Sequence, residues 1–458
     1  MNRRGIGITK RGAVKTVLLL FLILAAAFPP AAFSAEPGLE DIRRAAVAAS
    51  PELRKLETSK QNQILAKMAY YFRHIPSLRA SANASYNLLP KAPTPALDRL
   101  DAGAALSISG TLSIFDGGKS KIERANLALD ESALDAQTQA RLFAVMEEAD
   151  SRYFACLEAE AAVKTAELQA QIGAVALETA EIRREGGILS PSDYYLALSN
   201  KSAADSSLAA AQTGLALARR RLEQLTGSAG IADLLPLDFG DYEDLLGAIS
   251  RWTMEEISAR FLKLKEILAS RSPALKSAYI TLKRAENEYS LAKSAFWPSL
   301  DLSASFNLGY DFMQISADPL SYGASLSLSG TIPLDYWTLI NSEQRQKNSL
   351  ENSRLDYEDT LASFDIDLQS QLFTLAGNAR TLIANRRQAE YSALLLEQQQ
   401  ELFHLSSVSM ASFLDAASRS LSGETQKNRA EFSFLRSLSA LKSLGAFGDD
   451  ELLSLLGG

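Results

Sequence analysis

Few residues in this sequence have the chemistry of a catalytic or metal centre. The 458-residue chain has one cysteine, Cys156, and two histidines, His74 and His404, which lie 330 positions apart. One thiol and two distant imidazoles are too few for a zinc cage within one chain, and a lone cysteine cannot form an intrachain disulfide. The nucleotide-binding motif G-x-x-x-x-G-K-[ST] is absent, as are H-E-x-x-H and G-x-S-x-G. We therefore expect no enzymatic activity, metal or cofactor.

The charge balance argues against nucleic acid as the main partner. The chain has 47 Lys and Arg against 54 Asp and Glu, a net charge of −7. Residues 1–35 hold five basic residues and no acid, so the remainder carries a net charge of −12. An acidic surface repels a polyanion. With 47% hydrophobic residues, the chain is expected to be folded rather than disordered.

Residues 1–35 have the order of an export signal. Residues 2–15 are basic, residues 17–28 are apolar, and small residues follow Pro29 and Pro30. This order predicts a secretory signal peptide. The alternative is an uncleaved anchor, although an apolar run of about 12 residues is shorter than the roughly 20 needed to span a bilayer. No later apolar stretch approaches about 18 residues, so any membrane-spanning part must consist of strands.

The chain contains an internal duplication. SPEL at 50–53 matches SPAL at 272–275, and LSISGTL at 106–112 matches LSLSGTI at 326–332. The offset drifts only from 222 to 220 residues between these matches, which indicates two copies of one unit. We therefore divide the chain into a signal peptide (1–35), a first structural repeat (36–227), a linker or equatorial segment (228–272), a second structural repeat (273–446) and a C-terminal tail (447–458).

Each repeat is predicted to contain a short helix, a pair of strands, a very long helix and one further helix. The long helices, expected at 119–185 and 337–405, contain no proline and would each extend about 100 Å. Helices of that length need neighbours along their whole length, as in coiled coils. The other helices are expected at 51–75 and 191–225 in the first repeat and at 273–297 and 409–444 in the second.

Four segments alternate apolar and polar residues with period two, at 78–86, 104–114, 300–308 and 326–334. This pattern is typical of membrane strands with one face toward lipid and one toward water. The alternative is an ordinary sheet covered on one side by helices. The polar side, however, is mostly Ser, Thr and Asn, and aromatic residues bracket the strands. These aromatic residues are Tyr86, Tyr310, Phe312 and Tyr322 near the loops, and Phe115, Phe296, Trp297, Tyr336 and Trp337 near the helices.

Four strands cannot close a membrane barrel, because the smallest such barrels have about 8. Unpaired strand edges in lipid would leave backbone groups without hydrogen bonds. Several copies must therefore each contribute four strands. Two copies would give 8 strands, and three would give 12, enough for a lumen.

The signal peptide, the tandem repeat, the strand pairs between very long helices and the G-x-x-S-x-x-D turn at 187–193 together resemble the TolC family of outer-membrane efflux proteins. The resemblance covers about residues 39–447. It implies a mainly α fold with a membrane β-barrel portion: a homotrimer with a 12-stranded barrel that continues into a periplasmic α-helical barrel. It also implies an exit duct for an inner-membrane transporter, in efflux or type I secretion, coupled through a periplasmic adaptor protein.

The resemblance assigns roles to both helix–helix turns. The first turn corresponds to the adaptor-docking turn of the family, and neighbouring residues correspond to its periplasmic gate. Phe403 stands where the family often has a gating tyrosine, and Asp415 matches a pore-facing acid. The implied site residues are Gly186, Gly187, Ile188, Leu189 and Ser190 for adaptor docking, and Ser192, Asp193, Phe403 and Asp415 for the gate and its selectivity.

The gate network of the family is only partly present. Ser412, Val408 and Ser406 replace an acid, the gate arginine and the turn glycine, respectively. Simpler interpretations also exist: Asp193 completes a capping box with the helix-capping Ser190, and Asp415 is a solvated helix acid.

Three further residues have plain structural interpretations. Arg183 and Arg184 are expected to favour the negative end of a helix dipole, and Cys156 is expected to be a small buried side chain.

Two other functions remain open alternatives, a periplasmic adaptor and a non-conducting surface coiled-coil scaffold. Cargo, whether drug, metal or protein, is not predicted by the sequence.

Overall fold

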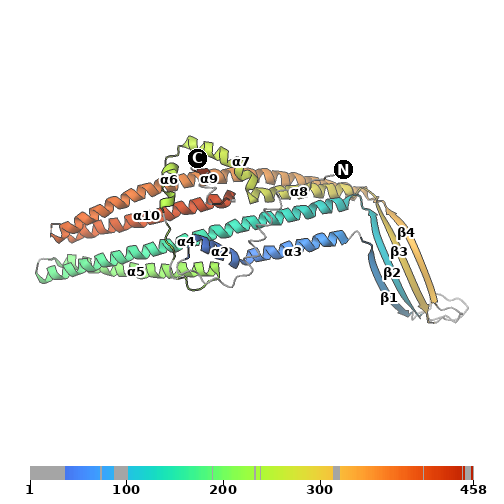
Figure 1. The fold of residues 1–458 in the computed structure, drawn as a ribbon, viewed down its shortest axis with the longest axis horizontal. Helices are drawn as coiled ribbons and strands as arrows, with labels where there is room; N and C mark the ends of the chain where they lie inside the picture. The colour runs from blue at the N-terminus through green and yellow to red at the C-terminus, as the bar shows by residue number, and fades with distance from the viewer. Residues whose placement is uncertain are drawn as a thin grey trace, which may run out of the picture. The chain divides into compact units, whose positions relative to one another are not determined.

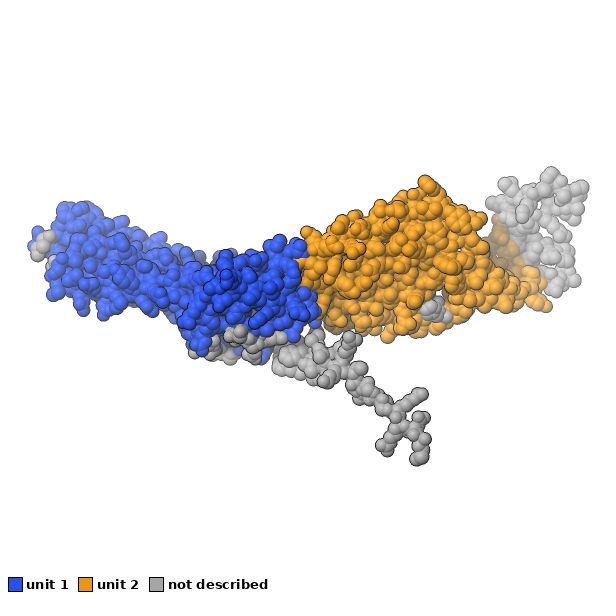
Figure 2. All heavy atoms as spheres, turned by 90° about the horizontal axis from the view of Figure 1, so that it is seen from above, with its two compact units in different colours: residues 1–55, 138–273, 362–458 blue, residues 56–137, 274–361 orange. Residues whose placement is uncertain are grey.

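The computed structural model forms helices α2–α10 and one four-stranded sheet (Figure 1). The predicted signal peptide lies outside the described residues. Two compact units are distinguished in Figure 2: unit 1 comprises residues 1–55, 138–273 and 362–458, and unit 2 comprises residues 56–137 and 274–361. The structure describes residues 37–72, 75–86, 102–187, 189–231, 234–237, 239–312, 320–405, 407–445, 447–448 and 455–456.

The two repeats have the same order of elements, as predicted. Boundaries agree with the sequence analysis within three residues, except that β4 begins six residues earlier. The first repeat contains α3 (Pro51–Phe72), β1 (Ser77–Tyr86), β2 (Ala102–Phe115), α4 (Lys119–Glu185) and α5 (Pro191–Thr226). The second contains α8 (Pro273–Ser294), β3 (Ser299–Asp311), β4 (Leu320–Thr331), α9 (Tyr336–His404) and α10 (Met410–Gly445).

Three helices were given no bounds in the sequence analysis. They are α2 (Leu39–Ala49), α6 (Gly240–Ser250) and α7 (Met254–Arg271). The last two occupy most of the predicted linker. Thr253 and Glu256 form a reciprocal capping box at the start of α7, a sequence signal for a helix that the linker assignment overlooked.

The sheet of unit 2 has the strand order β1-β2-β3-β4, and every neighbouring pair is antiparallel. The register places apolar residues opposite apolar residues: Ile108 faces Phe306, and Leu302 faces Leu328. The other side of the sheet carries a ladder of hydroxyl groups. The Oγ atoms are 2.7 Å apart in Ser81–Ser107 and 2.8 Å apart in both Ser303–Ser327 and Ser305–Ser325. The two-faced sheet predicted from the alternation is therefore present.

The alternation breaks at the helix-proximal end of β2. A register shift between Ser113 and Phe115 makes Phe115, rather than Ile114, the residue opposite Leu300. Such a bulge inserts one unpaired residue and bends the strand locally. Strict period two therefore holds only as far as Ser113.

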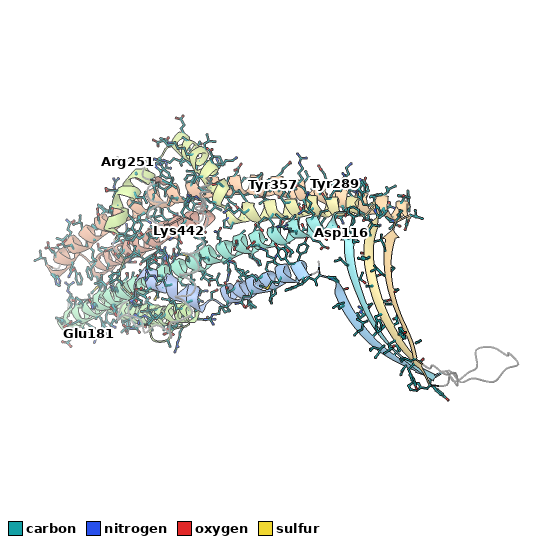
Figure 3. The ribbon with its side chains drawn as sticks, turned by 45° about the vertical axis from the view of Figure 1, so that its right-hand side comes forward. Asp116, Glu181, Arg251, Tyr289, Tyr357 and Lys442 are labelled. Atoms are coloured by element: carbon teal, nitrogen blue, oxygen red, sulfur yellow. The ribbon has the colours of Figure 1, made fainter. Side chains whose placement is uncertain are left out.

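Both long helices begin at a capping aspartate. Asp116, labelled in Figure 3 between β2 and α4, accepts hydrogen bonds from the backbone N–H groups of Gly118 at 3.0 Å and Ser120 at 2.8 Å. Asp335, just before α9, accepts hydrogen bonds from the Thr338 N–H at 3.3 Å and the Thr338 hydroxyl at 2.5 Å. These carboxylates satisfy backbone donors that have no partner inside the helix and suit its positive end.

Unit 1 is a helical bundle with a coiled-coil seam on α9. Leu368, Leu372, Leu375, Ala379 and Leu382 are buried and recur at intervals of four and three residues. None of the described helices is long and apolar enough to cross a membrane.

A buried ion pair joins three helices of unit 1. Arg43 of α2 donates to Asp150 of α4 through Nε at 2.5 Å and through Nη2 at 2.7 Å. Ser439 of α10 donates to the same carboxylate at 2.6 Å. Arg43 and Asp150 are 5% and 1% exposed, so this bidentate ion pair compensates two charges that are shielded from water.

Candidate functional site

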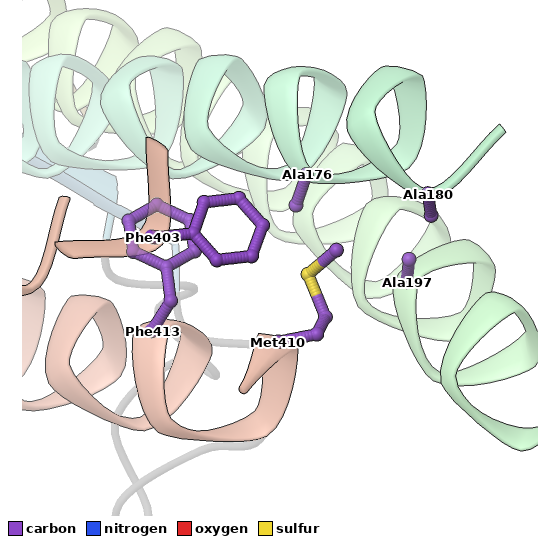
Figure 4. Close-up of a cluster of buried hydrophobic side chains, with 6 residues drawn as sticks. All are labelled: Ala176, Ala180, Ala197, Phe403, Met410 and Phe413. Atoms are coloured by element: carbon purple, nitrogen blue, oxygen red, sulfur yellow. The ribbon is translucent and has the colours of Figure 1, made fainter. Parts of the chain in front are cut away.

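A buried apolar cluster joins the two helix–helix turns of unit 1, and we call it the turn cluster. Figure 4 shows the rings of Phe403 and Phe413 beside each other, with Met410 nearby. Val408 and Leu189 pack against the cluster from the two turns. Its buried members are Ala176 and Ala180 of α4, Ala197 of α5, Phe403 of α9, and Met410 and Phe413 of α10.

Phe403 is a packed residue within one chain, with 1% of its surface exposed. Its ring stacks on Phe413 with centroids 4.7 Å apart and an interplanar angle of 9°. The Arg183 guanidinium lies 4.6 Å from the Phe403 ring centroid, and Nη2 donates to the Phe403 carbonyl oxygen at 2.9 Å. Arg183 therefore does more than complement a helix dipole: it binds the first repeat to the second.

The first turn is built for chain reversal. Gly187 has φ 72°, a left-handed conformation that favours glycine, and no atom lies within 4 Å of where its Cβ would be. Gly186 and Gly187 are exposed, while Leu189 is partly buried against the turn cluster. Ile188 lies outside the described residues. The turn therefore presents backbone to the surroundings and anchors itself through Leu189.

Ser190, Ser192 and Asp193 interact with one another at the start of α5. Ser190 is the N-cap, and its Oγ accepts a hydrogen bond from the Asp193 N–H at 3.3 Å. The Ser190 hydroxyl donates to Asp193 Oδ2 at 2.9 Å, and the Oγ atoms of Ser190 and Ser192 are 2.8 Å apart. Ser190 is thus the N-cap that the sequence suggested, but the Asp193 carboxylate bonds to its hydroxyl. The role of Ser192 and Asp193 in the periplasmic gate, which the resemblance implies, stays a prediction.

Asp415 lies on the exposed side of α10. Its Oδ2 is 2.9 Å from Nε of Arg419, one helical turn later, and its side chain is 61% exposed. Ser412, which replaces an acid in the family pattern, has its hydroxyl 3.3 Å from the Gln399 side-chain oxygen. Sequence analysis did not identify Arg419, although an acid and an arginine four residues apart on a helix signal such a pair.

The turns also contain a contact that the sequence did not predict. The Arg184 guanidinium lies 4.0 Å from the centroid of the Tyr194 ring, within the first repeat. The structure thus brings Arg183 to Phe403 and Arg184 to Tyr194. In the described part of one chain, no hydrogen bond, ion pair or ring contact joins Asp193 or Asp415 to Phe403.

Chemically reactive side chains are scarce outside the turns as well. Among the described residues, no group of three or more His, Cys, Asp or Glu side chains is placed to hold a metal ion. Cys156 is buried, as predicted. The pKa of its thiol is raised to about 11, mainly by burial and further by the nearby Glu160 carboxylate. A thiol with that pKa is unreactive near neutral pH.

Comparison with known protein families finds a match in the C-terminal part of the chain. Residues 264–446 match the family model described as "Outer membrane efflux protein". This segment belongs to the outer membrane efflux protein family. The match lies in the second repeat and the helix that precedes it, and it confirms the resemblance stated from the sequence. No curated protein sequence matches the chain.

Solved structures show that the efflux-protein fold extends over nearly the whole chain. CusC has a TM-score of 0.74 at 15% identity, covering 92% of this chain and 96% of its own. CmeC, an outer membrane channel of Campylobacter jejuni, has a TM-score of 0.73 at 14% identity, covering 92% and 89%. The outer membrane protein VceC of Vibrio cholerae has a TM-score of 0.72 at 14% identity, covering 89% and 96%. The predicted fold class is therefore confirmed.

Proposed function

We propose that three copies of this efflux protein form an outer-membrane channel extending into the periplasm, the exit duct of an inner-membrane transporter. The duct would serve efflux or type I secretion and be reached through a periplasmic adaptor protein. The observation that carries the proposal is the sheet of unit 2, which has one apolar face, one hydroxyl-rich face and, in the part of the chain that the structure describes, two unpaired edges.

The apolar face of the sheet is exposed in a single chain. Leu78, Leu326 and Leu328 are 80%, 73% and 65% exposed, and Ile108 and Phe306 are also exposed. Soluble monomers rarely leave a contiguous apolar patch larger than a few hundred Å². Exposed aromatic residues at both ends of the strands, among them Tyr86, Tyr322, Trp297 and Trp337, suit the two boundaries of a membrane. This distribution supports a lipid-facing surface.

The two edges of unit 2 support self-association. β1 and β4 are the outer strands, so within the described residues each leaves one row of backbone N–H and C=O groups without a partner strand. The helix that precedes β1 exposes Ile64, Met68 and Phe72, and the helix that follows β4 exposes Trp337 and Ile340. A second copy would pair the strand edge and cover the helix surface on the same side. Three copies supply the 12 strands that leave a lumen, whereas 8 would be filled by side chains.

The hydroxyl face would line the channel. Its serine ladder is uncharged, and among the polar-face side chains that the structure describes the charged ones are Arg79 and Asp301. Such a lining offers hydrogen bonds without a strong field, so it supports passage of varied cargo rather than one ion. We infer no catalytic activity in this duct, and the partner pump would supply the energy.

The turns of unit 1 are proposed as the adaptor-docking and gating end. Exposed Gly186 and Gly187 leave space for a partner's backbone, and Asp415 repeated by a three-fold axis would attract cations. Phe403 is buried, so its role would be to hold the closed arrangement rather than to block the pore itself. A protein of the same fold, MtrE of Neisseria gonorrhoeae, is described in an open state, which supports a gate with two arrangements.

Extraction and native mass measurement test this proposal. We expect the protein in outer-membrane fractions to resist release by salt, to dissolve in mild detergent, and to give a mass of three chains. Release without detergent would instead favour a periplasmic adaptor or scaffold. A monomer that inserts stably into lipid would contradict the shared sheet.

A further inference from the structure

A small cavity lies between α3 and α4 in unit 2, apart from the residues of the turn cluster. Its volume is about 130 Å³. A drug-sized ligand needs roughly 300–1,000 Å³, so this cavity suits a small chemical group rather than transported cargo. Its lining residues are Lys67, Tyr70, Tyr71, Arg124, Leu127 and Ala128.

The walls of the cavity are fixed by contacts between the two helices. The Tyr70 hydroxyl donates to the Ser120 carbonyl oxygen at 2.6 Å, and the Gln63 side chain donates to the Leu127 carbonyl oxygen at 3.0 Å. Lys67 forms an ion pair with Glu131. The cavity is therefore a preformed feature of the α3–α4 pair.

Two donor groups at the cavity have no hydrogen-bonding partner in the described part of the chain. Arg124, an exposed residue, makes no hydrogen bond or ion pair there. The Tyr71 hydroxyl makes none either: Tyr71 is 59% exposed, and its ring packs edge-on against Tyr70 with centroids 5.8 Å apart. A guanidinium and a phenol, with the Lys67 ammonium beside them, favour an acceptor-rich anion. Arginine in particular matches the oxygen spacing of phosphate.

The position of the cavity along the chain points to the source of that anion. Tyr71 is followed by Phe72, Ile75 and Leu78, which are all strongly exposed and lead into β1. Arg124 lies in the second turn of α4, shortly after the end of β2. If the sheet lies in lipid, as proposed above, the cavity is near the level where the strands leave the hydrocarbon and head groups begin.

We propose that this cavity binds the phosphate of a membrane-lipid head group, with Arg124 and Tyr71 as donors and Lys67 as a supporting charge. The acyl chains would lie against Phe72, Ile75 and Leu78. The proposal rests on the proposed function only in placing the sheet in lipid. It adds a lipid site on the helical part of each subunit.

Native mass spectrometry of the full-length protein in mild detergent, titrated with phosphatidylglycerol, tests this site. Arg124→Gln and Tyr71→Phe should each weaken lipid binding, the arginine change by at least about tenfold because a charge-assisted hydrogen bond is lost. Arg345→Gln, an exposed arginine of α9 outside the cavity, is the matched control and should bind like the wild type. Arg124 has no described hydrogen bond or ion pair to lose, so its replacement should leave assembly intact.

The results that would overturn the lipid site differ from those that would overturn the proposed channel. Equal lipid binding by Arg124→Gln and Arg345→Gln, in protein that still assembles and inserts, would overturn the lipid site alone. Displacement of the lipid by inorganic phosphate at equal concentration would assign the cavity to a free anion and also overturn it. Loss of insertion and of lipid binding in every form, wild type included, would instead count against the proposed function.

Discussion

The Arg183 guanidinium lies 4.6 Å from the centre of the Phe403 ring, and Arg183 also donates to the Phe403 carbonyl oxygen at 2.9 Å. The two residues are 220 positions apart, which is close to the offset between the repeats. They therefore lie at nearly equivalent ends of two duplicated hairpins, and their contact ties one hairpin to the other. Stacking of Phe403 on Phe413 extends this link into α10.

Arg183→Gln should loosen the turns. The change removes a cation–π contact worth about 0.5–2 kcal/mol and a charge-assisted hydrogen bond. We expect faster hydrogen exchange over residues 403–413 and a higher open probability in single-channel recordings. Arg184→Gln is the control, because Arg184 stacks on Tyr194 within its own hairpin. Equal exchange in the two variants would show that Arg183 does not hold the hairpins together.

The Asp415–Arg419 pair sets a prediction about selectivity. If Asp415 faces the channel axis, Asp415→Ala should lower cation selectivity without harming assembly. Arg419 lies 2.9 Å from the same carboxylate, so Arg419→Gln should raise cation selectivity by removing the compensating charge. Reversal potentials under a salt gradient measure both effects. If neither variant shifts the reversal potential, the pair is a solvated helix pair, worth only about 0.3–0.5 kcal/mol, and the constriction lies elsewhere.

The fold was largely predictable because its signals are local. Pro51 and Pro273 mark helix starts, long proline-free stretches mark α4 and α9, and period-two alternation marks the strands. The duplication strengthened each assignment, since every element was expected twice.

The contacts at the turns were not predictable in the same way. No local pattern connects Arg183 to a phenylalanine 220 residues later, because that contact depends on how two hairpins pack. Phe403 was identified from a family position, but its burial against Phe413 follows only from the three-dimensional arrangement. The Asp415–Arg419 pair, by contrast, has a local signal in its four-residue spacing.

The buried Asp150 should be critical for stability. Asp150→Ala removes the buried acidic partner of the Arg43 guanidinium and leaves it only the largely exposed Glu40, and loss of a buried partner typically costs about 3–5 kcal/mol. Replacing both partners, as Arg43→Met with Asp150→Leu, should be much milder because the charge left without its partner, Glu40, is largely exposed to water. Arg152→Ala, which breaks the exposed pair with Glu148, should cost less than about 1 kcal/mol. Thermal unfolding midpoints in one detergent rank the variants, and similar midpoints for Asp150→Ala and Arg152→Ala would refute the assignment.

The capping aspartates predict a specific acid response. Burial alone would raise the pKa of Asp116, but hydrogen bonds from Ser120 and Gly118 outweigh it and lower the pKa below 3.8. Hydrogen bonds from Thr338 likewise lower the pKa of Asp335. A carboxyl whose pKa is lower in the folded state stabilises that state above its unfolded pKa of about 3.9, and this stabilisation disappears as the pH falls through the folded pKa.

Asp116→Asn isolates this contribution, since asparagine is also a good helix cap. We expect the wild type to lose more thermal stability than Asp116→Asn between about pH 5 and pH 3, because in that range an aspartate takes up a proton on unfolding and an asparagine does not. Unfolding midpoints at both pH values measure the difference. An identical acid dependence would mean that the Asp116 cap does not contribute through its charge.

Single-channel recording in planar bilayers tests the central claim most directly, namely that opposite faces of one sheet meet lipid and channel water. Leu328 and Ser327 are adjacent in β4 and lie on opposite faces. Leu328→Arg should cost about 2–4 kcal/mol at the bilayer midplane and impair insertion, whereas Ser327→Arg should assemble, insert and reduce conductance. A wild-type protein that does not conduct, or two variants that insert and conduct equally well, would contradict the account.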